Sequence, residues 1–285
     1  MTDPLVSVIV PIYNIESYLD VALDSLYQQC TKEIEVILIN DGSTDSSINI
    51  AREWCGRLTN LATVITIEHS GISMARNIGL RRATGEFIYF MDGDDQLVPG
   101  SLTLMYSICK ANKLDILQCR HLEFISGEEN EKCLNQAIMS NNSYIATIEE
   151  QLIMDGRSLF EKQWRDGTYA VPVWRCMYNR EFLIDNHIDF EEGIFFEDHL
   201  FSFEVMLLAQ RAMAIHEIVY CRRTRKGSVS DLMQIELFRS AMRTTINRIE
   251  RILESERPTG YKDAAIEYLD YLRHQLSNCE DFCNK

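Results

Sequence analysis

Apolar and polar positions alternate in blocks along the first 120 residues. Short runs of Val, Ile, Leu and Phe are typical of strands buried on both faces, whereas apolar residues spaced three or four apart are typical of helices. The runs predict strands over residues 5–12, 33–40, 61–68 and 86–91. A helical segment follows each run, including one over residues 73–83 and one that opens at Pro99. This alternation predicts an α/β fold with a mostly parallel central sheet flanked by helices.

The alternation weakens after about Leu122. Further helices are predicted near residues 148–160, 180–186 and 198–210, with a strand over 212–221. Two more helices, separated by Pro258-Thr259-Gly260, are predicted at the C-terminal end, since Pro and Gly interrupt helices. We therefore divide the chain into residues 1–120, residues 121–230 and a C-terminal helical extension over residues 231–285.

The charge of the chain restricts its partners. Its 285 residues carry 43 Asp and Glu against 28 Lys and Arg, a formal net charge of −15. Because phosphate backbones are bound by basic surfaces, this charge argues against a nucleic-acid partner. No stretch reaches the roughly 20 apolar residues of a membrane span, and the N-terminal apolar run is too short for a signal peptide. The nine cysteines are odd in number and form no C-x-x-C pair, which favours buried thiols in a reducing compartment over a disulfide framework. We expect a soluble, cytoplasmic protein.

Polar clusters follow each of the first four predicted strands. They are Pro11–Asn14, Asp41–Asp45, His69–Gly71 and Asp92–Asp95. In an open parallel sheet, ligands bind beyond the carboxyl ends of the strands, so these four loops are expected to meet at one edge. The sequence therefore predicts a single acidic site assembled from four loops.

Several ligand classes lack their sequence signals here. The first strand is followed by VPIYNIESYL, which has no glycine-rich turn for a nicotinamide cofactor, and no phosphate-binding P-loop is present. The acidic loop does not have the EF-hand pattern, and no His and Cys spacing suits zinc. The remaining interpretation is Mg²⁺ or Mn²⁺ bound by carboxylates, with water and a nucleotide diphosphate completing its shell.

Three segments carry a family resemblance. VSVIVPIYNIESYLDVALDSL, EVILINDGSTDSS and GISMARNIGLRRATGEFIYFMDGDDQLVPGSL resemble the inverting glycosyltransferase family 2, which has the GT-A fold. The family's D-x-D element corresponds to Asp92-Gly93-Asp94. The resemblance implies that Pro11, Tyr13 and Asp41 line the uracil and ribose of a UDP-sugar. It also implies that Asp92 faces the ribose and the metal and that Asp94 binds the metal directly.

A catalytic base must come from another segment, because inverting transfer requires a carboxylate to remove the acceptor proton. The segment GIFFEDHLFSFEVM places Glu197-Asp198-His199 in an apolar run, where burial raises the pKa of a carboxyl. The family's E-D element corresponds to this position and implies Asp198 as the base, with Glu197 and His199 beside it as acceptor contacts. The alternative is that these acids only stabilise a helix start.

The other candidates each have a structural alternative. Arg76 is a nucleotide contact by resemblance, or a surface charge. Trp174 belongs to the acceptor site or to the core. Arg222, Arg223, Arg225 and Lys226 belong to a flap over the diphosphate, with no choice made among the four, or to a solvated basic loop. Asp95 binds the metal or caps the following helix, and Asp45 is expected to cap the helix after the second strand.

The resemblance implies a metal-dependent enzyme that moves one sugar from a UDP-sugar to a hydroxyl of a saccharide or lipid-linked acceptor, as in bacterial surface polysaccharide synthesis. Residues 1–120 would bind the donor, and residues 121–230 would bind the acceptor and hold the base. The alternatives are a sugar-phosphate nucleotidyltransferase and a non-catalytic nucleotide-sugar-binding protein. The predicted helix over residues 237–253 carries Arg239, Arg243, Arg248 and Arg251, which leaves open a peripheral contact at the inner face of the membrane.

Overall fold

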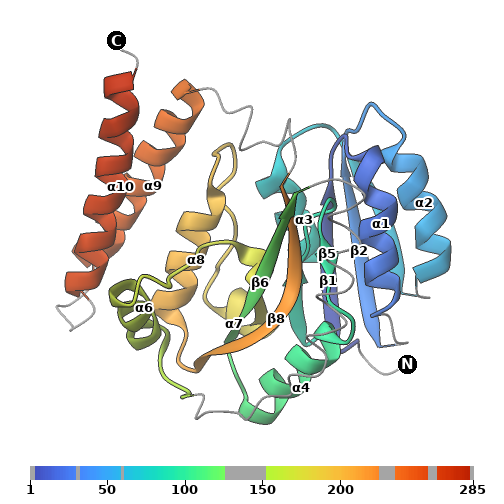
Figure 1. Ribbon diagram of the computed structural model, residues 1–285, viewed down its shortest axis with the longest axis horizontal. Coiled ribbons are helices and arrows are strands. Elements are labelled where there is room, and N and C mark those ends of the chain that lie inside the picture. The colour runs from blue at the N-terminus through green and yellow to red at the C-terminus, as the bar shows by residue number, and fades with distance from the viewer. Residues whose placement is uncertain are drawn as a thin grey trace.

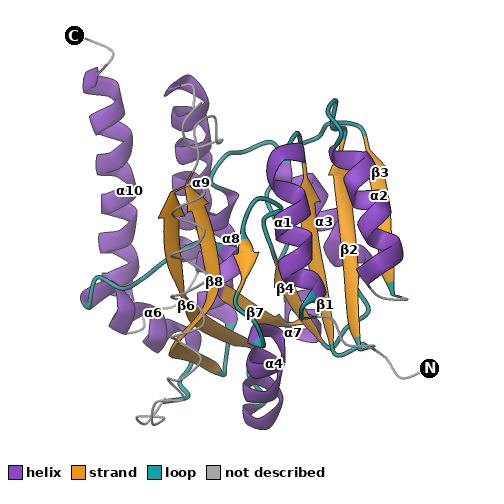
Figure 2. Ribbon diagram, turned by 45° about the vertical axis from the view of Figure 1, so that its right-hand side comes forward, coloured by secondary structure: helices purple, strands orange, loops and turns teal. Residues whose placement is uncertain are grey.

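The computed structural model describes residues 4–29, 33–58, 61–125, 152–224, 235–255 and 262–282. One eight-stranded sheet with the order β3-β2-β1-β4-β7-β6-β8-β5 runs through the molecule (Figures 1 and 2). The strands are β1 (Val6–Ile12), β2 (Ile34–Asp41), β3 (Ala62–Ile67), β4 (Phe87–Phe90), β5 (Gln96–Leu97), β6 (Ile116–Ile125), β7 (Cys176–Asn179) and β8 (Ala212–Thr224). The helices are α1 (Glu16–Tyr27), α2 (Ser47–Leu58), α3 (Ile72–Arg82), α4 (Ser101–Asn112), α6 (Gly156–Arg165), α7 (Arg180–Asp185), α8 (Glu197–Leu208), α9 (Ile235–Ser255) and α10 (Lys262–Phe282), with a 3₁₀ turn η1 (Val173–Arg175).

The first four of these strands pair in parallel, as the apolar runs predict. Successive side chains of a strand point to opposite faces, so β1 supplies both layers of the core. Val8 and Val10 belong to the apolar cluster that includes Leu19 and Leu23 of α1. Ile9 belongs to the other cluster, on the side of α3. The predicted α/β architecture, with a central sheet flanked by helices, is confirmed.

The second half of the sheet is mixed. β7 pairs antiparallel with both β4 and β6, β6 pairs parallel with β8, and β5 pairs antiparallel with β8. The sequence pattern predicted β8 but not β5, β6 or β7. Two residues in β5 and four in β7 are too few for a hydrophobic period to stand out.

Helices α9 and α10 pack against each other and stand at the opposite end of the molecule from α1 and α2 (Figure 1). Their apolar faces, which include Met242, Ile249 and Leu272, join the same core cluster as Leu200 and Phe203 of α8. Within the described ranges, no helix combines the length and the apolar character that a membrane crossing requires.

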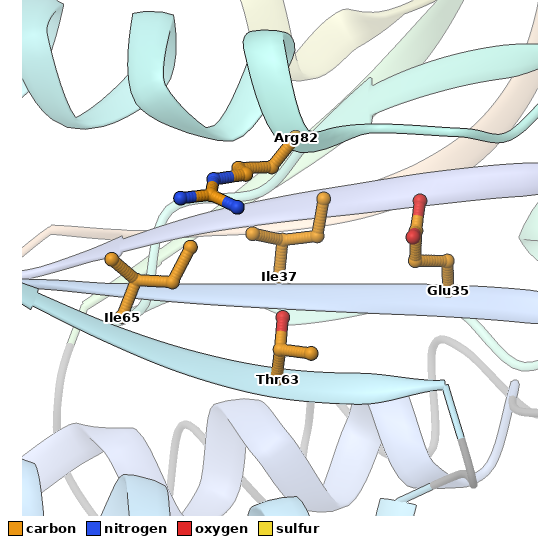
Figure 3. Close-up of a pocket in the computed structure, with 5 residues that line it drawn as sticks. All are labelled: Glu35, Ile37, Thr63, Ile65 and Arg82. Carbon is orange, nitrogen blue, oxygen red and sulfur yellow. The ribbon is translucent and has the colours of Figure 1, made fainter.

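A pocket of about 310 Å³ lies against β2 and β3 (Figure 3). Glu35 and Ile37 of β2, Thr63 and Ile65 of β3, and Arg82 of α3 line it. None of these five residues belongs to the loops that follow the parallel strands. The pocket is therefore separate from the site predicted at the carboxyl ends of the strands.

Candidate active site

The loops after β1 and β2 are joined by hydrogen bonds. The backbone N–H of Thr44 donates to Oδ1 of Asn14 at 2.8 Å, and the N–H of Glu16 donates to Oδ2 of Asp45 at 3.0 Å. Asp45 Oδ1 also accepts from the N–H of Ser47, the first residue of α2, so its side chain binds the start of this helix from two residues before it. The two loops thus form one frame.

Asp41 fastens the third loop to this frame. Its carboxylate accepts hydrogen bonds from the N–H groups of Ser70 and Gly71 at 2.7 and 3.0 Å, and His69 Nδ1 lies 2.9 Å from Oδ2. Asp41 itself is 3% exposed. The ring of His69 stacks on Tyr13 with 4.0 Å between centroids, so the first and third loops also touch. Tyr13 remains 43% exposed, which leaves an aromatic surface at the rim of the site.

The Asp92–Asp95 loop lies directly on the first loop. A Cβ atom at Gly93 would lie 2.6 Å from Cδ1 of Ile15 and 3.2 Å from the carbonyl oxygen of Pro11, so a larger residue would push the loops apart. The absence of a side chain at Gly93 therefore allows the fourth loop to lie against the first. With the contacts among the other three, the four loops meet at one edge of the sheet, as predicted.

Asp95 connects the same loop to β8. Its carboxylate accepts from the N–H of Arg223 at 2.6 Å and from the hydroxyl of Tyr220 at 2.9 Å. Burial, followed by the charges of Asp94 and Asp92, raises the pKa of Asp95 to about 8. The helix that follows, α4, has Gly100 at its N-cap and no capping side chain, so the alternative role of Asp95 as a helix cap was wrong.

Arg76 occupies the centre of the site. It is 2% exposed, and its guanidinium donates to Asp92 Oδ1 at 2.9 Å, to Glu197 Oε1 at 2.6 Å and to Asp198 Oδ1 at 3.0 Å. The alternative that Arg76 is a surface charge was wrong. One buried cation therefore joins the D-x-D loop to the Glu197-Asp198 pair, although more than 100 residues separate them in the sequence.

Glu197 and Asp198 form the first turn of α8. The side chain of Asp198 is 20% exposed and that of Glu197 is 9% exposed. Burial, with the neighbouring charge of Asp198, raises the pKa of Glu197 to about 8 in spite of Arg76. The more exposed Asp198 is thus the better placed of the two to exchange a proton with a bound molecule.

The remaining predicted residues lie in different surroundings. Trp174 is 4% exposed and its ring stacks on Tyr220 with 4.6 Å between centroids, which favours the core interpretation over sugar stacking. His199 is half-buried, with Nδ1 2.7 Å from the hydroxyl oxygen of Tyr268. Arg225 and Lys226 lie outside the described residues.

Asp92 and Asp94 supply the hard oxygen donors that Mg²⁺ and Mn²⁺ prefer. Both residues are partly exposed. Of the two carboxylate oxygens of Asp92, Arg76 contacts Oδ1. Among the described residues, no group of three or more His, Cys, Asp or Glu side chains could hold a metal ion. Such a donor set fits a cation that takes one or two protein carboxylates and leaves the rest of its shell to water and phosphate oxygens.

Sequence reasoning did not single out Tyr220 or Tyr268. The rule that sites form at strand ends includes His69 in the third loop but assigns it no role of its own. Tyr220 and Tyr268 contact the site from β8 and α10, and no local motif marks either of them.

Residues 7–185 match the family model described as Glycosyl transferase family 2. Among curated relatives, the chain is 32% identical over 232 residues to EpsJ of Bacillus subtilis, an uncharacterized glycosyltransferase, covering 80% of this chain and 64% of EpsJ. It covers only 32% of another relative, GlyA of Streptococcus pneumoniae, at 30% identity over 81% of this chain. The chain thus spans about one third to two thirds of the length of these relatives.

The fold is shared with TarS of S. aureus, solved in complex with UDP-GlcNAc. The TM-score is 0.69 at 24% identity, over 93% of this chain and 71% of that one. A mannosyltransferase of Pyrobaculum calidifontis, solved with GDP-Man and Mn²⁺, has a TM-score of 0.65 at 18% identity, over 99% of this chain and 74% of that one. At these identities the likeness concerns the fold, which is the GT-A fold. With the family match over most of the chain, the predicted membership is confirmed: this chain belongs to glycosyl transferase family 2.

Proposed function

We propose that the chain is an inverting, metal-dependent glycosyltransferase that moves a single sugar from a UDP-sugar to an acceptor hydroxyl. The carrying observation is the set of contacts made by Arg76, which bring Asp92 of the D-x-D loop and Asp198 of α8 to one guanidinium. Direct transfer needs the leaving diphosphate and the base on either side of one sugar carbon. The shared contact with Arg76 supports our proposal that these two carboxylates lie on either side of that carbon.

The donor half of the proposal uses the four loops, within residues 1–120. Pro11 and the exposed face of Tyr13 would receive the uracil, with Asp41 beside it, and Asp92 with Gly93 would face the ribose. Asp94, with Asp92, would hold Mn²⁺ or Mg²⁺. Support comes from the TarS complex with UDP-GlcNAc and from the presence of Mn²⁺ in the mannosyltransferase complex. A divalent cation at Asp94 would neutralise the diphosphate as it departs.

Asp198 is the proposed base. It removes the proton from the acceptor hydroxyl while that oxygen forms a bond to C1 of the sugar. The bond from C1 to the diphosphate oxygen breaks, and its electron pair leaves with UDP. Arg76 keeps Asp198 and Asp92 at fixed positions during this exchange, which is the role we assign to it in place of a direct nucleotide contact.

The acceptor half lies within residues 121–230, and we propose a saccharide or lipid-linked saccharide as acceptor, as in surface polysaccharide synthesis. Glu197 and His199 flank the base and would contact the acceptor. A peripheral membrane contact would involve the basic residues of α9, Arg243 and Arg251 among them. Arg225 and Lys226 stay a proposal for the diphosphate flap.

The test is release of UDP from a panel of UDP-sugars, with and without a chelator, by wild type, Asp94→Ala and Asp198→Asn. We expect the chelator and Asp94→Ala to abolish release, and Asp198→Asn to lower the rate by at least about 100-fold, since general-base catalysis contributes 10²–10⁴. Unchanged UDP release in the presence of the chelator would refute the proposed metal dependence. Near-normal UDP release by Asp198→Asn would refute the assignment of Asp198 as the base.

The two alternative functions give different results in the same experiment. A sugar-phosphate nucleotidyltransferase would produce pyrophosphate from UTP and a sugar phosphate. A non-catalytic binding protein would bind UDP-sugars and release no UDP from any of them. Neither result is expected.

A further inference from the structure

The start of α8 is held from the C-terminal side of the molecule. Tyr268 of α10 is 1% exposed, and its hydroxyl oxygen lies 2.7 Å from Nδ1 of His199. His199 directly follows Asp198 in the first turn of α8. A hydrogen bond to a buried hydroxyl fixes the ring of His199 and, through it, the backbone of this turn.

A second contact acts on the other side of the carboxylate pair. Phe196, at the N-cap of α8, has φ 58° and ψ 36°, the left-handed region that a bulky residue rarely adopts. Such a strained conformation persists only where surrounding contacts hold it. The ring of Phe196 packs edge to face against Phe238 of α9, with 5.3 Å between centroids. Glu197 and Asp198 therefore lie between two residues, each held by a different C-terminal helix.

The anchor of the first contact is rigid. The ring of Tyr268 lies within 6 Å of the rings of Phe160, Trp164, Tyr169 and Phe203. Ala265 and Leu272 of α10 are fully buried in the same cluster. Interiors packed in this way transmit displacement, so a shift of α10 would move the start of α8.

We propose that the hairpin of α9 and α10 positions the base Asp198, with Tyr268 and Phe238 as its two positioning residues. This inference rests on the proposed function. The hairpin and the Glu197-Asp198 pair both lie beyond residues 7–185, the region that matches the family model. These contacts of α9 and α10 with the start of α8 thus belong to a part of this chain that the family match does not cover.

The test is steady-state kinetics of UDP release by Tyr268→Phe, which deletes only the hydroxyl. Misplacement of a catalytic group by about 1 Å can cost 100-fold. We expect the kcat of Tyr268→Phe to fall roughly tenfold or more while KM for the UDP-sugar stays within about twofold, because the donor loops are untouched. Phe238→Ala is also expected to lower kcat.

Tyr169→Phe is the matched control. Tyr169 packs on Tyr268 in the same cluster, but its buried hydroxyl has no hydrogen-bond partner among the described residues. Its removal is therefore expected to leave kcat within about twofold of wild type. Melting temperatures of all variants, measured together, separate loss of positioning from loss of fold.

An NMR measurement of the His199 ring gives a readout without turnover. We expect the ¹⁵N shifts of wild type to show one fixed tautomer of His199 and those of Tyr268→Phe to show a mixture of both. A wild-type kcat in Tyr268→Phe, or an equal loss in Tyr169→Phe, would overturn the inference. Asp198→Asn separates the two failures: if it is inactive while Tyr268→Phe is normal, only the positioning role fails, whereas normal turnover by Asp198→Asn refutes the base itself.

Discussion

The central residue of this site is Arg76, one buried cation among three carboxylates. Although burial lowers the pKa of a guanidinium, the charges of Asp198, Asp92 and Glu197 raise the pKa of Arg76 overall. Its guanidinium also lies 5.2 Å from the centroid of the Phe190 ring. Removing one partner of such a buried network leaves the others uncompensated, which is costly even where the intact network adds little stability.

Arg76→Met is expected to lower the free energy of unfolding by about 3–5 kcal/mol, because three partly buried carboxylates lose their shared cation. Arg76→Lys should retain part of that stability, since it keeps the charge but not the planar fork that bridges two carboxyl groups. Urea denaturation measures both. A loss within about 1 kcal/mol for Arg76→Met would contradict the central role of this residue.

Glu204 of α8 predicts a pH dependence of stability. Burial raises the pKa of Glu204 to about 7 against the opposing charge of Arg248, and Asp189 and Glu191 raise it further. The protonated form is favoured in the folded state, so its stabilising contribution is full below the unfolded pKa of 4.5 and is lost as the pH rises to about 7.

Glu204→Gln should therefore gain stability relative to wild type between pH 5 and pH 8, on the order of 1 kcal/mol or more. Denaturant unfolding at the two pH values measures the change. Glu254→Gln, at an exposed position of α9, is the control and should show little pH-dependent difference. An advantage of Glu204→Gln that is the same at both pH values would contradict the assignment.

At the scale of elements, close contact between α3 and β1 sets the position of Arg76. A Cβ atom at Gly79, one turn beyond Arg76, would lie 2.3 Å from Cγ2 of Ile9, a fully buried residue. By contrast, a Cβ atom at Gly56 of α2 would meet nothing within 4 Å. Replacing glycine by alanine is thus expected to lower stability at position 79 of α3 and to raise it at position 56 of α2.

Gly79→Ala should destabilise the protein by about 1–3 kcal/mol through overpacking. It should also lower the rate of UDP release, because the displaced helix α3 would move Arg76 away from its carboxylate partners. Gly56→Ala should stabilise by up to about 1 kcal/mol, the difference in helix propensity. Melting temperatures and UDP release of the pair provide the measurement. Equal effects of the two variants would contradict the packing described for α3.

The parallel half of the fold could be predicted because its strands are continuous apolar runs separated by amphipathic helices. The short strand β7 could not, since its place between β4 and β6 is fixed by tertiary pairing. Within the site, Asp41 and Asp92 could be assigned to one sheet edge from their positions after strands. The Arg76 contacts with Glu197 and Asp198 depend on where α8 lies in space, which no local spacing encodes.

At the scale of the whole molecule, the two ends of the chain act on one site. The parallel strands β1 to β4 end in the four loops (Figure 2), and the carboxylates of Glu197 and Asp198 at the start of α8 contact Arg76. Helices α9 and α10 contact the start of α8 through Phe238 and Tyr268. The proposed donor binding and the proposed proton removal thus fall on different parts of the chain, and we expect substitutions to separate them.

Calorimetric titration of UDP in the presence of Mn²⁺, on wild type, Asp94→Ala and Asp198→Asn, tests this division most directly. We expect Asp198→Asn to bind UDP as wild type does, and Asp94→Ala to lose at least about tenfold in affinity, or 1.4 kcal/mol. Binding of UDP with Mn²⁺ to Asp94→Ala at the wild-type affinity would contradict the account.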